Sequence, residues 1–338
     1  MVKLSIIINR PTKDLEYSEL VLNVSGLSCV YLNSIKRILY EYIPTYAFNQ
    51  DNIIIEKSNT FLDNSRLRDR FQFLPIINLD PKIDYLDEKY YVNLDFENEE
   101  RPRHPQEKSI NIVFKNYNNR EEYKNVDTNT IQYFINGKEE KSPYNRNYPI
   151  LLCYLRNGEY IECVMKSSLG IGLMHPIYQP VYHTFYRENE KDNKTYDLIV
   201  HSKGQVSESD LLKKMCRTAK IILENHKKSM WKLLHEENIF APLVYEYQQY
   251  RDPEDIKNIT MDNFTFANII CEELQKDSKN ILFAGVSKEN FFDKVVHLKI
   301  RFNNVKDDKK QHEIIINAIN ECIKKFDDLE KELNKLFK

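Results

Sequence analysis

The sequence from position 30 to position 44 reads VYLNSIKRILYEYIP, and it carries the clearest structural signal in the chain. Apolar residues recur in it at steps of three and four, a spacing that predicts an amphipathic helix from about Val30 to Tyr42. Pro44 ends this helix, because the residue before a proline is driven out of helical geometry. Upstream, Leu20–Val24 alternate at period two, as a β-strand does. The unit is therefore a strand, a short loop and a helix.

The same unit recurs near the C-terminus at a shift of 235 positions. Such a repeat predicts two related modules that pair about a pseudo-twofold axis, as the subunits of an isologous dimer do. The matched pairs are Asn23/Asn258, Val24/Ile259, Tyr31/Phe266, Asn33/Asn268, Ile35/Ile270, Leu39/Leu274 and Phe48/Phe283.

A long helix closes each predicted module. Ser207 and Asp210 have the spacing of a capping box at the start of the first one. In the second, apolar residues from Ile315 to Leu336 step alternately by four and three, the spacing of a helix–helix seam. This seam predicts packing against Leu211–Leu234 of the same chain, and a coiled coil between two chains is the alternative.

The region from about Asp80 to Asn147 has a different character, with polar stretches between strand-like pieces. We expect it to be a small, loop-rich inserted β domain. Pro149–Arg156 and Glu159–Lys166 then predict a hairpin around Asn157-Gly158, a dipeptide suited to a type I′ turn. The polar stretch Glu246–Lys257 is the expected linker between the modules.

Composition limits the classes of protein. The chain has 338 residues and a formal net charge of −2, from 49 Lys and Arg against 51 Asp and Glu. A charge this close to zero argues against a protein whose whole surface grips nucleic acid through its phosphates. Seven glycines disfavour folds built on phosphate-cradling loops. Hydrophobic residues at 41% and charged residues at 30% are typical of a soluble globular protein.

The six cysteines indicate neither a zinc site nor a disulfide framework. No two of them stand at C-x₂-C spacing, and scattered thiols of this kind fit a reducing compartment. The sequence has no apolar run near the ~20 residues of a membrane span, and its N-terminus does not resemble a signal peptide. We therefore expect a soluble intracellular protein. The cysteines are Cys29, Cys153, Cys163, Cys216, Cys271 and Cys322.

Several segments of the first module resemble the alpha-type subunit of cellular RNA polymerases. Leu32–Leu39, followed by Pro44, resembles the first helix of that family, which has an Asn-x-x-x-Arg core. Asn64–Pro75 is similar to a family segment that carries an arginine and ends in proline. Leu169–Pro176 resembles the Gly-x-Gly-x-x-His stretch where the family's inserted domain rejoins the main one.

The second module resembles the smaller partner, the eleventh subunit of the eukaryotic enzyme, in Asn263–Asn268 and Asn280–Lys288. Two positions depart from that pattern. Ala267 replaces the glycine that precedes the asparagine, and Asn263 stands where an acidic residue or histidine is common. The presence of both parts in one polypeptide is similar to polymerase subunits of large DNA viruses.

The resemblance implies an α+β fold in which two alpha-subunit-like dimerisation modules form an intramolecular pseudo-dimer. Zinc-binding cysteines of some relatives have no counterpart between Asp80 and Leu152, so no metal or other cofactor is implied. The implied parts are a third-subunit-like module at 1–79 and 167–245, an inserted β domain at 80–166, a linker at 246–257 and an eleventh-subunit-like module at 258–338.

The function that the resemblance implies is a non-catalytic assembly scaffold of a viral DNA-directed RNA polymerase. Its partners would be two large catalytic subunits and small polymerase subunits, with nucleic acid contacted only indirectly, no membrane and no homo-oligomer. The host cytoplasm or the virion is the implied location. Family members hold the large subunits with the first helix, and arginine suits such interfaces because its guanidinium pairs bidentately with carboxylates. The implied interface residues are Asn33, Arg37, Arg66, Arg70, Gly170, Gly172, His175 and Asn268.

Two other functions remain open. Cys153 or Cys163 with a histidine such as His175 would suit a Cys/His hydrolase, although no local signature supports one. A stand-alone homodimeric binding module is the second alternative. The Gly-x-Gly-x-x-His stretch at 170–175 lacks the third glycine and the following helix of a dinucleotide fingerprint, so it predicts a close turn instead of a nucleotide site.

Overall fold

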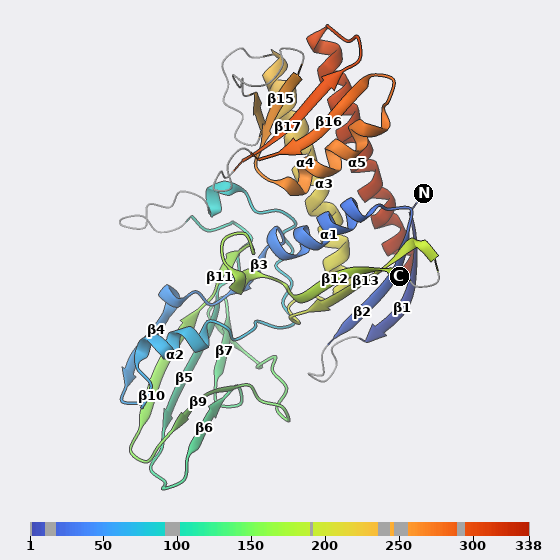
Figure 1. The fold of residues 1–338 in the computed structure, drawn as a ribbon. Helices are drawn as coiled ribbons and strands as arrows, with labels where there is room; N and C mark the ends of the chain where they lie inside the picture. The colour runs from blue at the N-terminus through green and yellow to red at the C-terminus, as the bar shows by residue number, and fades with distance from the viewer. Residues whose placement is uncertain are drawn as a thin grey trace.

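The computed structural model describes residues 2–10, 18–91, 102–189, 192–235, 244–246, 256–288 and 295–337. The fold is α+β, with several antiparallel sheets. Figure 1 shows a larger lobe that holds both chain ends and a smaller lobe formed by the middle of the sequence. Within the described residues, no helix is both long and apolar enough to cross a bilayer.

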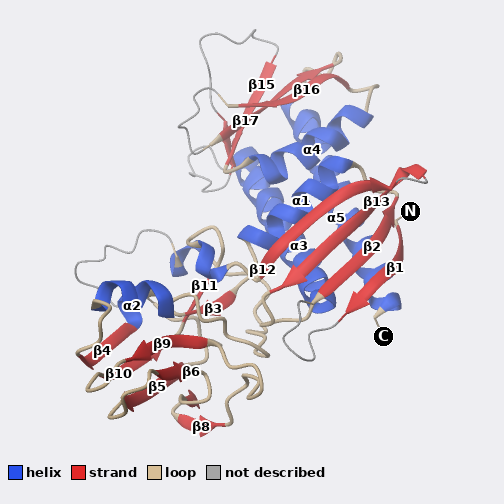
Figure 2. Cartoon of the chain, turned by 60° about the horizontal axis from the view of Figure 1, so that its bottom comes forward, coloured by secondary structure: helices blue, strands red, loops and turns tan. Residues whose placement is uncertain are grey.

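One half of the larger lobe is an antiparallel sheet with helices on one face (Figure 2). Its strands stand in the order β1-β2-β13-β12, and the alternation predicted around Leu20–Val24 is confirmed, since Leu20, Leu22 and Val24 all enter the core. Its elements are β1 (Lys3–Arg10), β2 (Glu19–Ser25), α1 (Cys29–Glu41), β12 (Val181–Asn189), β13 (Asp192–Ser202) and α3 (Glu208–His235).

The other half of the larger lobe repeats this order of elements. Two antiparallel strands are followed by a helix, two more strands and a long helix, and the sheet order β14-β15-β17-β16 matches β1-β2-β13-β12 strand for strand. Its elements are β14 (Val244–Glu246), β15 (Ile256–Met261), α4 (Phe264–Lys276), β16 (Ile281–Ser287), β17 (Val296–Phe302) and α5 (Asp308–Leu336).

The two short helices correspond residue for residue. α1 spans Cys29–Glu41 and α4 spans Phe264–Lys276, so both ends of the helix are offset by 235 positions. The apolar steps that predicted α1 are buried, with Leu32, Ile35 and Leu39 almost inaccessible to solvent. At ~1.5–3 kcal/mol for each fully buried aliphatic side chain, this face holds the helix in place.

The helices of both halves share one hydrophobic core (Figure 1). α1 packs against the first sheet and α4 against the second, and the two helices contact each other. The predicted seam lies within the chain, because α5 packs antiparallel along α3. Lys213, near the start of α3, donates to the carbonyl of Phe337 after the end of α5 (3.0 Å). Lys220, two turns further along α3, donates to Glu330, which lies earlier in α5 (2.6 Å).

The start of α3 is also as predicted. The Ser207 hydroxyl accepts the backbone N–H of Asp210 (3.2 Å) and donates to that residue's carboxylate (2.7 Å), which satisfies a donor that the first helical turn leaves unpaired. The predicted linker lies largely outside the described residues. Glu246 ends β14 and Ile256 begins β15, and positions 247–255 between them are not described.

The smaller lobe has its own core around a five-stranded sheet, β4-β10-β5-β7-β8. This core begins at Tyr46, well before the predicted boundary at 79/80, because β4 pairs with β10 and α2 packs beside them. The additional elements are β3 (Thr45–Ala47), β4 (Ile53–Ser58), α2 (Asn64–Phe71), β5 (Ile110–Tyr117), β6 (Lys124–Asp127), β7 (Gln132–Ile135), β8 (Lys138–Glu140), β9 (Leu151–Leu155), β10 (Tyr160–Lys166) and β11 (Ser168–Gly170).

The hairpin predicted around Asn157-Gly158 is wrong. β9 pairs with β6, and β10 lies between β4 and β5 in a different sheet. Gly158 has a φ of +79° but Asn157 does not share the positive φ that a type I′ turn requires at both positions. The other Asn-Gly pair forms that turn: Asn136 (φ +51°) and Gly137 (φ +79°) connect β7 to β8, with Ile135 opposite Lys138.

Candidate partner interface

The N-caps of α1 and α4 each reach across to the other helix. Ser28 stands at the N-cap position of α1, where its side chain makes no cap bond, and its hydroxyl donates to the Glu272 carboxylate of α4 (2.5 Å). Asn263 caps α4 and donates through Nδ2 to the Tyr42 hydroxyl at the end of α1. The residue that precedes each helix therefore bonds to the C-terminal half of the other helix or to its C-cap. The two contacts are similar in place but do not join equivalent residues, because Glu272 corresponds to Arg37 and not to Tyr42 at the offset of 235 positions.

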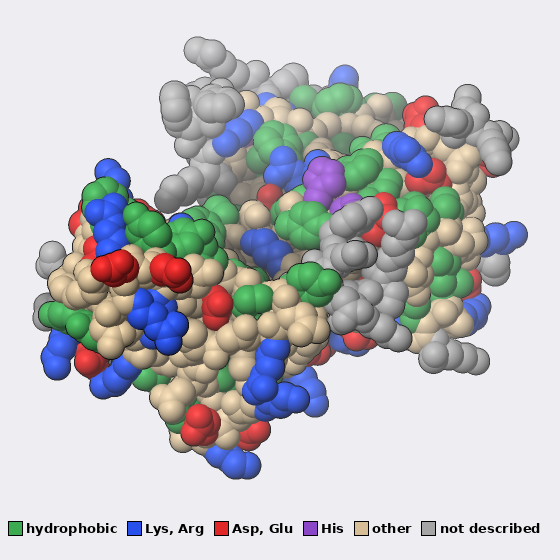
Figure 3. Space-filling view, turned by 90° about the horizontal axis from the view of Figure 1, so that it is seen from below, with side chains coloured by type: hydrophobic (Ala, Val, Ile, Leu, Met, Phe, Trp, Pro, Cys, Tyr) green, Lys and Arg blue, Asp and Glu red, His purple; other side chains and the backbone are tan. Residues whose placement is uncertain are grey.

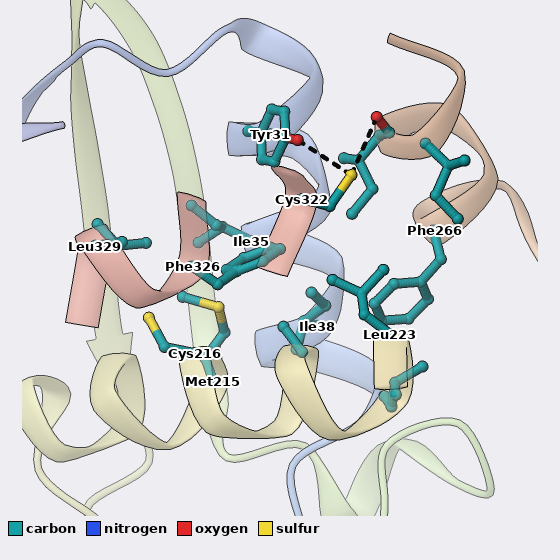
Figure 4. Close-up of a cluster of buried hydrophobic side chains, with 14 of the residues drawn as sticks. Tyr31, Ile35, Ile38, Met215, Cys216, Leu223, Phe266, Cys322, Phe326 and Leu329 are labelled. Atoms are coloured by element: carbon teal, nitrogen blue, oxygen red, sulfur yellow. Dashed lines mark hydrogen bonds between the residues drawn. The ribbon is translucent and has the colours of Figure 1, made fainter. Parts of the chain in front are cut away.

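Each short helix also makes an aromatic contact with the long helix of the other half, and Figure 4 draws the residues of one of these contacts, Tyr31 and Phe326. Tyr31 of α1 lies against Phe326 of α5, with ring centroids 6.0 Å apart, and Phe266 of α4 lies 5.6 Å from His226 of α3. α5 also packs against β1 and α3 against β14, so each long helix reaches the first strand of the other half's sheet.

A charged network closes one side of this helix layer. The Glu273 carboxylate of α4 accepts from Lys325 of α5 (2.6 Å) and from the Tyr31 hydroxyl of α1 (2.7 Å). Lys325 also lies over the Tyr31 ring, 4.1 Å from its centroid. Burial alone would raise the pKa of Glu273, but hydrogen bonds from two lysines and Tyr31 outweigh burial and hold that pKa below its usual range. Three helices from both halves are thus tied through one carboxylate.

Sulfur and hydroxyl groups add to these contacts in the interior. The Cys322 sulfur lies 3.3 Å from the Tyr31 hydroxyl and its thiol donates to the Ile269 carbonyl at 3.5 Å (Figure 4). The Ser34 hydroxyl of α1 donates to the carbonyl of Thr265 in α4 (3.0 Å). These polar groups are satisfied in the space between the helices, as buried polar groups generally are.

The outer face of α1 carries two of the predicted interface residues. Asn33 and Arg37 are both exposed and stand four residues apart on one stripe of the helix. The Arg37 side chain is 52% exposed and pairs with Glu41 at 3.0 Å. An exposed pair of this kind contributes ~0–1 kcal/mol, so the guanidinium can exchange Glu41 for another carboxylate at little cost. Asn268, the counterpart of Asn33 on α4, is half-buried.

The predicted close turn at 170–175 lies against the end of α1. The Leu173 N–H donates to the Glu41 carbonyl (2.9 Å), which caps the helix. A Cβ on Gly172 would meet the Tyr40 carbonyl oxygen at 1.8 Å, so only glycine fits this approach. His175 is exposed, and its Nδ1 accepts the Ile177 N–H (3.3 Å). Gly170 is buried against the Tyr178 ring.

Arg66 and Arg70 are not brought to this turn. Both are exposed on α2 in the smaller lobe, which Figures 1 and 2 show well apart from α1. Arg66 pairs with Asp63 at 3.6 Å. The segment that follows α2 does return to the turn, because Phe73, Pro75 and Ile177 line a pocket of about 140 Å³ at the junction of the lobes. Figure 3 shows that this face is hollowed between the lobes, with hydrophobic and histidine side chains beside the hollow.

The cysteines do not form a nucleophilic site in the described residues. Burial raises the pKa of the Cys153 thiol to about 12, and burial does the same for Cys163. A thiol nucleophile needs its pKa lowered, because the thiolate is the reactive form. Among the described residues, no group of three or more His, Cys, Asp or Glu side chains has a geometry that could hold a metal ion.

Sequence reasoning missed the residues that carry the contacts between the halves, namely Ser28, Asn263 and Glu273. One signal was available for two of them: Ser28 and Asn263 are also 235 positions apart, and both are residue types preferred at helix N-caps. Glu273 offered no local signal, since its partners lie on two other helices.

Comparison with known proteins adds one relative. The chain is similar to a protein described as a putative DNA directed RNA polymerase subunit, R470, of Acanthamoeba polyphaga mimivirus. The two are 22% identical over 298 residues, which covers 81% of this chain and 78% of the relative. No protein-family model matches the chain. The similarity therefore extends beyond any single one of the predicted parts, that is, the two modules and the inserted domain.

Proposed function

We propose that this chain is a non-catalytic assembly scaffold of a viral, multisubunit DNA-directed RNA polymerase. The observation that carries the proposal is the similarity over 81% of the chain to a mimivirus protein described as a putative subunit of such an enzyme. In this proposal the third-subunit-like and eleventh-subunit-like modules form an intramolecular pseudo-dimer, and the smaller lobe is the inserted domain. Catalytic groups and metal belong to the large subunits, and nucleic acid is contacted through them.

The repeated element order supports the pseudo-dimer. Both halves have the same sheet order, and their short helices have the same length at a constant offset. The residue at each N-cap position bonds across to the other short helix or its C-cap, and each long helix contacts the first strand of the other half's sheet. The helix faces that would pair with a second copy are already covered by the other half of the same chain. The proposal therefore includes no homo-oligomer.

The outer stripe of α1 is the proposed contact with a large subunit. Asn33 and Arg37 present an amide and a guanidinium there, and the turn at 170–175 extends the surface at the end of the helix. Arg66 and Arg70 on α2 would form a second contact on the smaller lobe, so that a large partner spans both lobes. Asn268 occupies the corresponding place on α4.

Purification of the tagged full chain from its native source tests the function. We expect two large polymerase subunits and small subunits in stoichiometric amounts, in infected cytoplasm and in virions. Recovery of the chain without large subunits would overturn the proposal, and recovery as a homodimer would favour the binding-module alternative. A hydrolase would instead lose activity with Cys153→Ala while remaining folded, a result that the high pKa of that thiol argues against.

The substitution Arg37→Glu tests the proposed surface. Charge reversal on an exposed helix face should block polymerase assembly, because a like charge then opposes the partner's carboxylate. The isolated chain should unfold within ~0.5 kcal/mol of wild type, as surface variants usually do. Lys324→Glu is the matched control, since Lys324 is also an exposed helical cation paired with a carboxylate on its own helix (3.4 Å). Equal assembly of both variants would count against this surface.

A further inference from the structure

The smaller lobe has a pronounced apolar concavity on its surface. It has a volume of about 430 Å³ and lies between the loop after β4, helix α2 and strand β9. Leu62 and Leu67 form part of its wall, and the Leu67 side chain is otherwise in the core of the lobe. We call this concavity the insertion groove, defined by Phe61, Leu62, Leu67, Tyr123 and Tyr154. Its size is in the range of sites that take one or two bulky side chains.

Three large aromatic side chains surround the insertion groove and are exposed to solvent. Phe61 is 71% exposed, Tyr123 68% and Tyr154 55%. Isolated exposed aromatics are common on proteins, but a cluster of them around one concavity marks a contact site. Aromatic anchors of this kind supply much of the binding energy in protein–protein interfaces, because they bury a large area with few rotatable bonds.

The charges at the rim favour an acidic partner. The Arg156 guanidinium lies over the Phe61 ring at 4.2 Å, and Arg70 is exposed on α2. Arg70 lies near the groove, because its positive charge acts on the groove-lining Cys153 thiol. Burial raises the pKa of that thiol to about 12, and the Arg70 guanidinium opposes the rise.

The carboxylates near the groove are already engaged. Asp63 accepts the backbone N–H of Arg66 (2.9 Å), and Glu159 accepts that of Arg156 (2.7 Å). Among the described residues, neither Arg70 nor Arg156 has a carboxylate within salt-bridge distance, so both guanidinium groups can pair with a carboxylate of another chain. Arginine binds carboxylates in a bidentate geometry that fixes their orientation.

We propose that the insertion groove binds a segment of another protein in which a bulky apolar side chain is flanked by carboxylates. The apolar side chain enters between Leu62, Leu67 and Tyr154, and the flanking carboxylates pair with Arg70 and Arg156. This assignment shares Arg70 with the second contact proposed above, but it rests on the insertion groove and does not depend on the polymerase scaffold role. Single-stranded nucleic acid would also stack on exposed aromatics. It is the less favoured occupant, because Leu62 and Leu67 of the groove wall offer no ring on which a base could stack.

A direct binding experiment on the full chain tests the proposal. The probes are three fluorescently labelled, capped hexapeptides, DEFLDE, KKFLKK and DEAADE, and a labelled ten-nucleotide oligouridine, each titrated to millimolar protein by fluorescence anisotropy. We expect DEFLDE to bind and the other three to bind at least about tenfold more weakly, since both the anchor and the charges are required.

Substitutions assign the binding to the groove. Tyr154→Ala and Arg70→Glu should each weaken DEFLDE binding by about tenfold or more. Tyr148→Ala and Arg146→Glu are the matched controls on the same lobe, since Tyr148 is 63% exposed and Arg146 is also exposed, and neither lines the groove. Thermal melting checks that all four variants are folded.

Every other outcome overturns the proposal. Equal binding of KKFLKK would remove the acidic requirement. Binding of the oligouridine that is lost with Tyr154→Ala would make the groove a nucleic-acid site. Absence of DEFLDE binding at millimolar protein, or binding unchanged by both groove variants, would leave the groove without the proposed ligand. Loss of polymerase assembly with Arg37→Glu is unaffected by any of these results, so the two proposals fail separately.

Discussion

His226 is a residue at which the two halves differ in chemistry. It faces Phe266 from α3, as Phe326 faces Tyr31 from α5, but neither nitrogen of its fully buried imidazole has a hydrogen-bond partner among the described residues. Burial lowers the pKa of His226 to about 4 and raises that of Asp262 to about 7. Their closest atoms are 3.9 Å apart, too far for a hydrogen bond.

We predict that His226→Phe stabilises the fold. An aromatic ring of similar shape keeps the contact with Phe266 and removes two unsatisfied polar atoms, which should raise the free energy of unfolding by about 1–2 kcal/mol. Urea denaturation near pH 6 measures this, because both groups are then neutral in the fold. His226→Leu is a second variant that also removes the polar atoms, and it tests whether the phenyl ring of His226→Phe is too large for the site. A loss of more than 1 kcal/mol in both variants would indicate that the imidazole pairs with Asp262.

Gly172 is the residue where backbone approach is tightest. Gly172→Ala should destabilise the protein by about 3 kcal/mol, at the upper end for overpacking, because the neighbouring atom is a backbone carbonyl that cannot rotate away. Gly285→Ala is the control, since there the added methyl meets the exposed ring of Phe283. Urea denaturation should separate the two variants by at least about 2 kcal/mol, and equal losses would contradict this account.

At the scale of elements, α1, α4 and α5 are joined through Glu273. A carboxyl whose pKa is held low in the fold stabilises it above its unfolded pKa of ~4.3, and that stabilisation is lost as the pH falls through the folded pKa. Glu273→Gln should therefore lower the free energy of unfolding by about 2 kcal/mol at neutral pH, with a smaller difference from wild type near pH 3.

Glu321→Gln is the control for Glu273→Gln. Glu321 is exposed on α5 and pairs with Lys324 of the same helix (3.4 Å), so its substitution should change stability by less than about 0.5 kcal/mol. Chemical denaturation of the three proteins at several pH values makes the comparison. A deficit of Glu273→Gln that is the same at every pH would mean that packing, and not charge, holds the three helices together.

The elements themselves differ in how far the sequence predicts them. α1 begins and ends within one residue of the predicted Val30–Tyr42. Helical hydrogen bonds join residues four apart, so the signals for a helix are local. Strand partners are not local: β10 pairs with β4, about a hundred residues earlier, and the residues around Asn157-Gly158 give no sign of it.

At the scale of the whole molecule, the two modules should not fold separately. α1, α3, α4 and α5 contribute to one core, and each long helix covers the other half's first strand. We expect that a protease site inserted within 247–255 can be cut without separating the halves, because the covalent link supplies effective concentration and not contact area. Size-exclusion chromatography after cleavage measures this. Elution of two folded fragments would contradict a shared core.

The candidate interface was predictable only in part. The stripe of Asn33 and Arg37 follows from helical periodicity, which makes the opposite face of α1 the buried one. The position of Gly172 beside Tyr40 does not follow from either local sequence, since the two segments are more than a hundred residues apart. The insertion groove is of the same kind, because its walls come from α2, β9 and a loop that meet only in the fold.

The local sequence was enough to predict helix α1, the cap at Ser207, the alternation of β2 and the repeat at 235 positions, because each signal lies in residues close together along the chain. The tertiary structure decided which strands pair, where the smaller core begins, how the two N-caps exchange contacts and which surfaces stay open. These depend on which apolar faces bury each other, and that choice is made among elements distant in sequence.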